Sequence, residues 1–398
     1  MSTRRRPSEG LFFDGLRTNE ARLPAGLLRL GPPAAPEAIA STEQRLGQPL
    51  PHAYAEFLRS FDGADLFHES LVVFGVGGQG QAGLVRSNAE SPAGGHSDEL
   101  IIAEVSTGDL FTLELEAPET HDEPRVFRVG PDADERWLAG SSFPRWLAAI
   151  IAHDALLYDA EGEFLPDAFE PDGEELTPTF ALRQAERALR KDPGSALYHH
   201  EKGVALRRMG RLESARAAFG AAAAADPTNP WPWFDLGRAD HALGHYGQAA
   251  AAFECAAEAA DGGESARFCA WAARAFHLAG ERATALRLRT VALTRDPNLI
   301  DSLRAAAAAA VENDDPDAAR EAEELASLLG DGVPLARRLP VLSAPAAAAP
   351  SAPRPRPTSG GPAPGPARHN RKTPVPPKPQ RPPARKPKAK PKRRRPRG

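Results

Sequence analysis

The most regular pattern in the chain is a helical spacing of apolar and small residues over residues 177–329. Gly203 and Gly237 lie 34 residues apart, and each is followed at matching distances by a second glycine, an alanine and a phenylalanine. Prolines recur at one register, at Pro193, Pro227 and Pro297. Because proline ends a helix and small residues let two helices approach closely, the pattern predicts stacked helix pairs over residues 177–340.

The second full unit makes this pattern more specific. It contains W-x-x-L-G at Trp233, Leu236 and Gly237, followed by Ala249 and Phe253. Together with the 34-residue period, this resembles the tetratricopeptide repeat. The resemblance implies an all-α solenoid of helical hairpins that is stable only as a stack. The eleventh position departs from the usual tyrosine and holds Leu206, Asp240 and Phe276.

Repeats of this kind bind partners through the face of each first helix that points away from its hairpin partner. Helical periodicity places the second, fifth, ninth and twelfth residues of each unit on that face. We hypothesise a groove that captures an acidic segment or a chain-terminal carboxylate through arginine forks and aromatic anchors. An ordinary solvated helix face is the alternative. The predicted protein-binding groove residues are His200, Arg207, Trp231, Phe234, Arg238, His241, Arg267, Arg274, His277 and Arg304.

A different pattern, of short apolar runs between amphipathic helices, precedes the repeats. Helical spacing covers residues 38–46, 51–61 and 142–155, and Ser142 is placed to cap the last helix. Strand-like runs cover residues 71–74, 100–105, 110–115 and 125–129. These elements predict an α+β domain over 30–160, after an N-terminal extension (1–29) and before an acidic linker (161–176).

Ten positions of this domain resemble the SUKH superfamily, which includes a fungal cell-wall assembly regulator and bacterial toxin-immunity proteins. They are Gly47, Leu50, Pro51, Tyr54, Phe61, Asp62, Gly63, Gly108, Asp109 and Phe143. The resemblance implies a binding module that neutralises a toxin by contact or serves as a scaffold. Most of the ten encode the fold, and we interpret Tyr54 and Phe61 as core. Asp62 stands where asparagine is commoner, and residues 76–99 form a loop unusually rich in glycine and serine.

Three motifs resemble chemical sites without their usual context. Residues 78–83 match G-x-G-x-x-G, but we interpret them as a loop, whereas a dinucleotide site needs a helix inside a βαβ unit. His241 and His245 have a zinc-compatible spacing without a third ligand, and Cys255 and Cys269 fit small core positions. We expect no catalytic residues, metal or cofactor.

Charge divides the chain sharply. Residues 343–398 hold 16 of its 49 Lys and Arg residues and no Asp or Glu, which leaves 33 basic against 53 acidic residues, a net −20, before them. That segment also contains 17 prolines and no aromatic residue, so we expect residues 341–398 to form a disordered Pro/Arg/Lys-rich tail. Such a tail suits nucleic acid, another polyanion, a membrane surface or the acidic body itself.

These observations predict a cytoplasmic, non-enzymatic protein-binding adaptor with no transmembrane segment. One protein partner, for which a toxin is a candidate, would bind the N-terminal domain, and a second protein or peptide would bind the repeat groove. The alternative is a nucleic-acid-associated regulatory protein that is anchored by its basic tail.

Overall fold

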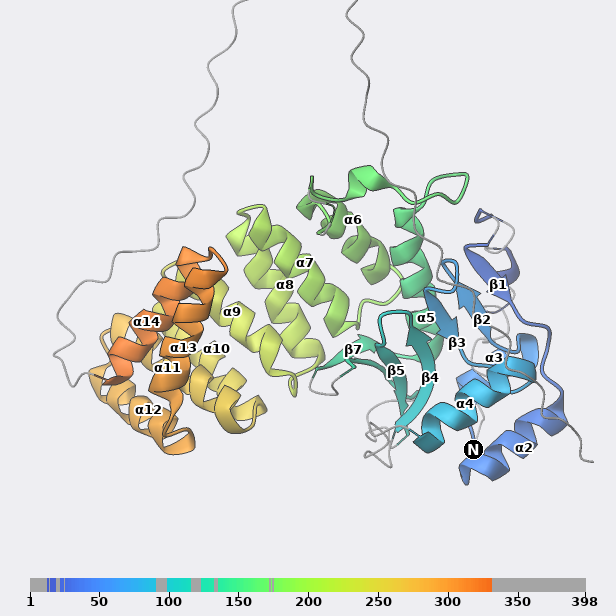
Figure 1. Ribbon diagram of the computed structural model, residues 1–398, viewed down its shortest axis with the longest axis horizontal. Coiled ribbons are helices and arrows are strands. Elements are labelled where there is room, and N and C mark those ends of the chain that lie inside the picture. The colour runs from blue at the N-terminus through green and yellow to red at the C-terminus, as the bar shows by residue number, and fades with distance from the viewer. Residues whose placement is uncertain are drawn as a thin grey trace, which may run out of the picture. The chain divides into compact units, whose positions relative to one another are not determined.

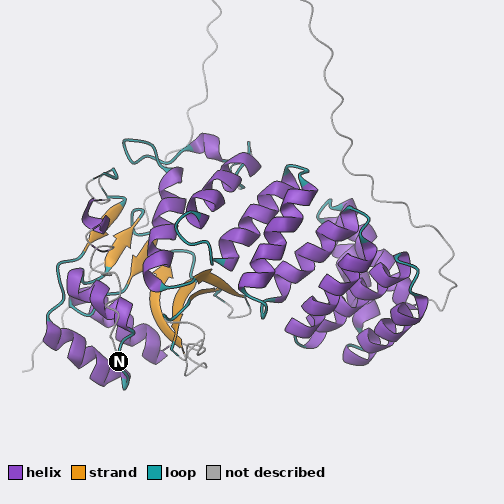
Figure 2. Cartoon of the chain, turned by 180° about the vertical axis from the view of Figure 1, so that it is seen from behind, coloured by secondary structure: helices purple, strands orange, loops and turns teal. Residues whose placement is uncertain are grey.

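The protein is described by a computed structural model. It describes residues 13, 15–18, 22–24, 26–90, 99–115, 123–131, 135–171, 173 and 175–330. The predicted disordered tail lies outside these residues. The N-terminal part contains one sheet, and helical hairpins follow it (Figures 1 and 2). The α+β region and the tetratricopeptide-like helices therefore occur in the predicted order.

The sheet is an antiparallel meander in which each strand pairs with its neighbours in the chain, in the order β1 to β7. The strands are β1 Leu28–Leu30, β2 Ala64–Leu66, β3 Leu71–Val73, β4 Glu99–Val105, β5 Leu110–Glu114, β6 Val126–Val129 and β7 Arg136–Gly140. Four of these were predicted, whereas β1, β2 and β7 were not. The missed strands have three to five residues and each includes a charged side chain, so they lack the uninterrupted apolar run that marks the equally short β3.

The N-terminal part includes helices α2 Pro36–Leu46, α3 His52–Ser60, α4 Gly78–Glu90 and α5 Phe143–Asp154. Helix α2 ends at Gly47, whose φ of 74° is the left-handed conformation that suits glycine. Ser142 precedes α5 as predicted, but its side chain makes no capping hydrogen bond. The core joins α3 and α5 through Tyr54, Phe57 and Phe143.

The structure corrects the loop predicted over residues 76–99. Residues 78–90 form helix α4, and its G-x-G-x-x-G run opens the helix. The loop interpretation was therefore wrong. However, β3 and β4, the strands on either side of this helix, pair antiparallel, whereas the dinucleotide fold requires parallel strands at this place.

The core also includes residues that the sequence assigned to an extension. Phe13, Leu16 and Leu27 are at most 2% exposed and belong to the same cluster as Tyr54 and the strands. Strand β1 pairs with β2 directly from Leu28. The packed N-terminal region therefore begins before residue 30.

The repeat region consists of helices from α6 onward. They are α6 Pro178–Leu189, α7 Ala196–Arg208, α8 Leu212–Ala225, α9 Pro230–Ala242, α10 Tyr246–Ala259, α11 Gly262–Leu278, α12 Arg282–Arg295, α13 Leu299–Glu312 and α14 Pro316–Gly330. Gly203 and Gly237 mark where the two helices of a hairpin cross. A Cβ atom at either position would lie 2.5–2.6 Å from the ring of Phe219 or Phe253 on the partner helix.

Helix α6 has the place of a second repeat helix, and the helix that pairs with it comes from the N-terminal part. Helix α5, the last helix of the N-terminal part, packs against α6. Ala149 of α5, Ala188 of α6 and Tyr198 of α7 share one buried cluster. The N-terminal region therefore supplies the missing half of the first hairpin, and the repeat stack continues directly from it.

The last hairpin departs from the regular stack. Helices α8 and α10 each pack on the first helix of the next hairpin, α9 and α11. The backbones of α12 and α13 make only slight contact, and α14, which pairs with α13, also packs on α11. Figure 1 shows α13 and α14 beside α11. As a result α14 reaches the face of first helices on which the groove was predicted.

Candidate protein-binding site

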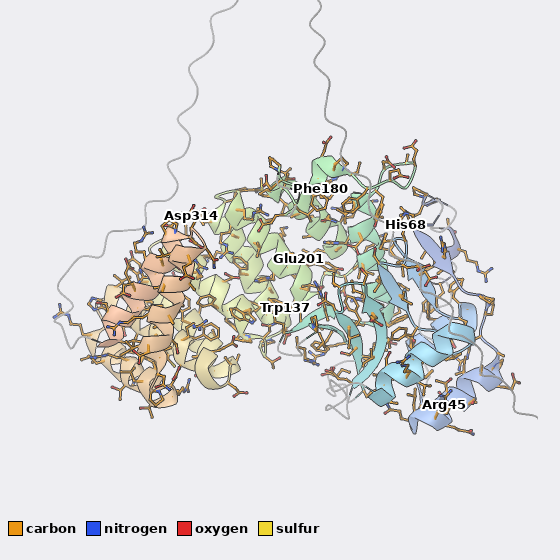
Figure 3. All side chains as sticks on the ribbon, viewed as in Figure 1. Arg45, His68, Trp137, Phe180, Glu201 and Asp314 are labelled. Atoms are coloured by element: carbon orange, nitrogen blue, oxygen red, sulfur yellow. The ribbon has the colours of Figure 1, made fainter. Side chains whose placement is uncertain are left out.

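The amino-terminal end of the predicted groove is covered by the N-terminal region. Leu197 of α7 is 8% exposed and belongs to the core of that region. The Trp137 ring of β7 lies 4.5 Å from the ring of His200. Figure 3 shows Trp137 where the sheet meets the repeat helices and Glu201 on the first full hairpin. This end of the face is therefore an internal interface and is closed to a partner.

A carboxylate on the next first helix binds two predicted groove residues. The His200 ring nitrogen lies 2.8 Å and the Arg207 guanidinium 2.9 Å from the Asp235 carboxylate of α9. Burial favours a raised pKa for Asp235, but the hydrogen bond from His200 and the charge of Arg207 outweigh it and hold that pKa below its usual value. His200 and Arg207 therefore join α7 to α9.

The predicted aromatic anchors are also partly occupied. The Phe234 ring centroid lies 5.0 Å from Phe268 and 5.7 Å from Trp271 on α11, and Trp231 meets Phe268 edge-on at 5.7 Å. These contacts hold α9 against α11. Trp231 and Phe234 are half-buried, so their primary role is in the packing of neighbouring repeats.

The middle of the face is cationic, and α14 covers it. Arg238 of α9 pairs with Glu321 at 3.4 Å, and Arg274 of α11 pairs with Glu324 at 2.5 Å. Arg274 is only 3% exposed and lies over the Trp271 ring. The structure thus brings these two arginines together with acidic partners, and the acidic segment belongs to the chain itself.

Two histidines lie on α9 and α11 beside the arginines of this patch. Burial, with the positive charges of Arg274 and Arg238 added to it, lowers the pKa of His241 to about 4. His241 is therefore neutral near pH 7. His277 is half-buried near the end of α11. His245, four residues after His241, pairs with Asp240 instead.

Two predicted groove residues remain accessible. Arg267 on α11 and Arg304 on α13 are exposed, and no ion pair to either is found in the part of the chain that the structure describes.

The eleventh position of the second full unit holds Asp240 in place of the usual tyrosine. Asp240 is buried and pairs with Arg216 of the preceding helix, which accounts for the carboxylate at this position.

The family-motif positions of the N-terminal region hold its loops and core. The Tyr54 hydroxyl donates to the Phe74 carbonyl at 2.5 Å, and the two Asp62 oxygens accept the amides of Val76 and Gly77. An asparagine side chain has a single acceptor oxygen, whereas the aspartate has two, one for each of these backbone amides. This explains why position 62 holds a carboxylate. Asp109 pairs with Arg128 at 2.9 Å. The glycines at 47, 63 and 108 have positive φ, and Leu50, Phe61 and Phe143 are buried, while Pro51 precedes α3.

Sequence reasoning missed the polar joint between the two regions. Asp192, which is fully buried, accepts hydrogen bonds from the Ser141 amide and hydroxyl, both at 2.7 Å. His153 of α5 lies 3.1 Å from Glu201 of α7. The Asn229 amide donates to the Arg136 carbonyl at 2.9 Å. The only signal in the sequence was that Asp192 precedes a repeat proline, a position that normally serves to end a helix.

Two classes of site receive no support from the described residues. No group of three His, Cys, Asp or Glu side chains among them is placed to hold a metal ion. No helix in the same part of the chain is long and apolar enough to cross a membrane. Cys255 and Cys269 are both free, half-buried and buried respectively.

Comparison with known proteins agrees with this division. Residues 33–149 match the SMI1/KNR4 family (SUKH-1), and residues 206–272 match a tetratricopeptide repeat. No curated protein matches the chain.

Among solved structures, MamA matches with 17% identity over 38% of this chain and 88% of its own, at a TM-score of 0.29. MamA 41-end from Desulfovibrio magneticus RS-1 has 21% identity over 38% and 85%, at 0.28. YrrB, a TPR protein with an unusual peptide-binding site, has 18% identity over 38% and 78%, at 0.29. Scores this low carry no functional argument. The chain thus contains an SMI1/KNR4-type (SUKH-1) region followed by tetratricopeptide repeats.

Proposed function

We propose that this protein is a non-enzymatic adaptor that holds a protein partner on its N-terminal region and a second polypeptide on its repeats. Tetratricopeptide and SUKH regions fit a protein-interaction role, and both are typically non-catalytic. The observation that carries the proposal is the buried joint between the two regions. Because Asp192 and His153 fix the repeats to the sheet, two partners would be held in a defined relative orientation.

The N-terminal region is the candidate site for the first partner. Its family resemblance favours an immunity role, with a toxin as the partner, or a scaffolding role. Co-expression with a toxin encoded beside this chain distinguishes the two, because rescue of growth with direct binding supports immunity. Binding to a non-toxic partner with no rescue supports scaffolding.

The repeat partner is tested by affinity purification with the full chain. Arg267→Glu combined with Arg304→Glu reverses the exposed groove charges, and Arg211→Glu combined with Arg282→Glu reverses two exposed charges on or next to second helices. We expect the first pair to lose at least one specific partner that the second pair retains. An identical partner set for both pairs would reject binding through this face.

The basic segment favours a second candidate function, that of a nucleic-acid-associated regulator in the same compartment, which we take to be cytoplasmic. Its charge of +16 supports salt-sensitive binding to a polyanion. The test is a chain that ends at residue 342. Loss of nucleic-acid association together with function supports the regulator, whereas retained function supports the adaptor.

A further inference from the structure

Helix α14 has the features of a ligand for the repeat groove. It buries one apolar stripe, formed by Leu325, Ala326 and Leu329, against the core of the third hairpin. Glu321 and Glu324 flank this stripe and reach the arginines of α9 and α11. Helix α14 pairs with α13 as the second helix of the last hairpin, and its Leu329 carbonyl accepts a hydrogen bond from Arg289 of α12 at 2.8 Å. It also contacts equivalent positions of two successive first helices, α9 and α11, as a bound peptide helix would.

The contact at Arg274 is incomplete. Only one of its guanidinium nitrogens meets Glu324, while its Nε and Nη1 atoms are buried with no hydrogen-bond partner in the described part of the chain. A guanidinium can bind both oxygens of a carboxylate in parallel, and a buried N–H without an acceptor has a desolvation cost. A carboxylate that reached a second guanidinium nitrogen of Arg274 would therefore bind more strongly than Glu324 does.

The rest of the patch selects the same kind of ligand. Arg238 gives the groove a second positive charge one repeat away from Arg274, and the Trp271 ring gives it an apolar floor. A basic or neutral helix would leave both guanidinium groups without partners. The complementary ligand is a helix with one apolar stripe and carboxylates beside it.

We propose that α14 is a displaceable occupant of the repeat groove, and that the groove's partner is an acidic amphipathic helix of another protein that replaces α14 and binds Arg274 with both carboxylate oxygens. This proposal rests on the proposed function, since it names the partner chemistry and the self-blocking contact of the same surface. When α14 is docked, the groove is closed, and the apparent affinity for the partner falls in proportion to the open fraction.

The test uses the full chain and a fluorescein-labelled peptide with the sequence of residues 316–330. The loosened variant is Glu321→Gln with Glu324→Gln. The matched control is Glu312→Gln with Glu323→Gln, which removes the same charge from exposed positions of α13 and α14. Fluorescence anisotropy measures peptide binding, and hydrogen–deuterium exchange of residues 316–330 measures docking of α14.

We expect the loosened variant to bind the peptide about tenfold more tightly than the wild type or the control, because its groove is open more often. Addition of Arg274→Gln to the loosened variant should remove this binding. Exchange of residues 316–330 should speed up in the loosened variant alone. A further variant that adds Leu329→Ala keeps the test decisive if the charge change leaves α14 docked.

Three results would overturn the proposal. They are equal peptide binding by all variants, no peptide binding by the Leu329→Ala variant although α14 exchanges rapidly, and peptide binding that survives Arg274→Gln. None of these depends on the purification that tests the adaptor. If Arg267→Glu with Arg304→Glu still loses a partner, the adaptor stands without this ligand, and if it loses none, the adaptor fails independently.

Discussion

The buried histidine at the joint between the two regions makes stability depend on pH in a defined direction. His153 lies between two carboxylates, Asp154 at 2.5 Å and Glu201 at 3.1 Å, and its side chain is 16% exposed. Burial alone would lower its pKa, but the charge of Glu201 and the hydrogen bond to Asp154 outweigh this and raise the pKa to about 10. The folded protein therefore holds this proton at neutral pH.

The raised pKa sets the sign and the pH window of the effect. Below about pH 6.5, the usual pKa of histidine, the imidazolium contributes its full stabilisation, because both the folded and the unfolded states carry the proton. As the pH rises toward 10 the unfolded state has already released it, so stability falls by up to about 1.4 kcal/mol per pH unit. Because solvent partly screens the two half-buried carboxylates, we expect a total loss of unfolding free energy on the order of 3 kcal/mol.

The perturbation is His153→Gln, which keeps a polar side chain but cannot carry the charge. Its unfolding free energy should be lower than that of the wild type at pH 6.5, and the difference should shrink steadily toward pH 9.5. The measurement is urea unfolding followed by far-UV circular dichroism at fixed pH values. His199→Gln is the control, because the ring of His199 meets the Pro193 carbonyl rather than a carboxylate. Parallel pH curves for the wild type and His153→Gln would refute the reasoning.

Three further predictions test the packing around this joint and in the groove. Gly237→Ala should destabilise the chain by roughly 1–3 kcal/mol, because its Cβ meets a phenylalanine ring of α10, whereas Gly247→Ala, with open space around it, should leave thermal unfolding unchanged or slightly raised. Asp192→Ala should lower the free energy of unfolding by about 1–3 kcal/mol and accelerate hydrogen exchange of the Ser141 amide. Unchanged exchange would contradict the role of Asp192 in holding Ser141. Between about pH 6.5 and 4 the unfolded state takes up a proton on His241 that the folded state does not, so the wild type loses unfolding free energy as the pH falls. His241→Gln should reduce this loss, as urea unfolding across that pH range would show.

The repeat architecture could be predicted from sequence because close helix crossings demand particular residues. Gly203 and Gly237 are fixed by the phenylalanine rings that pack on them, so their 34-residue spacing can be recognised in the amino-acid sequence alone. The short strands were different. Strand β7 has five residues and borders the repeats, so its side chains are selected by contacts with α7 rather than by alternation between core and solvent.

The contacts of the predicted groove residues could be anticipated only in part, because they depend on the tertiary structure. Helical periodicity correctly brings Arg238 and Arg274 to one face, but it cannot show which acidic residues meet them. Glu321 lies 83 residues after Arg238 and Glu324 lies 50 residues after Arg274, and both reach these arginines because α14 packs on α11. In the same way, no local pattern indicates that Leu197 packs into the core of the N-terminal region.

The predicted binding face of the first helices is covered at both ends, but by different kinds of contact. That difference determines where a partner can enter. At α7, closure depends on buried apolar contacts and on Asp192, which has three backbone or hydroxyl donors around it and is shielded from salt. At α9 and α11, closure depends on the buried apolar stripe of α14 and on two ion pairs, one of them 3.4 Å long with an arginine that is 38% exposed. Salt and competing carboxylates weaken this exposed ion pair far more than they weaken the buried contacts at α7. The joint with the N-terminal region should therefore persist under conditions that release α14, and a partner of the repeats would enter from the carboxyl-terminal side.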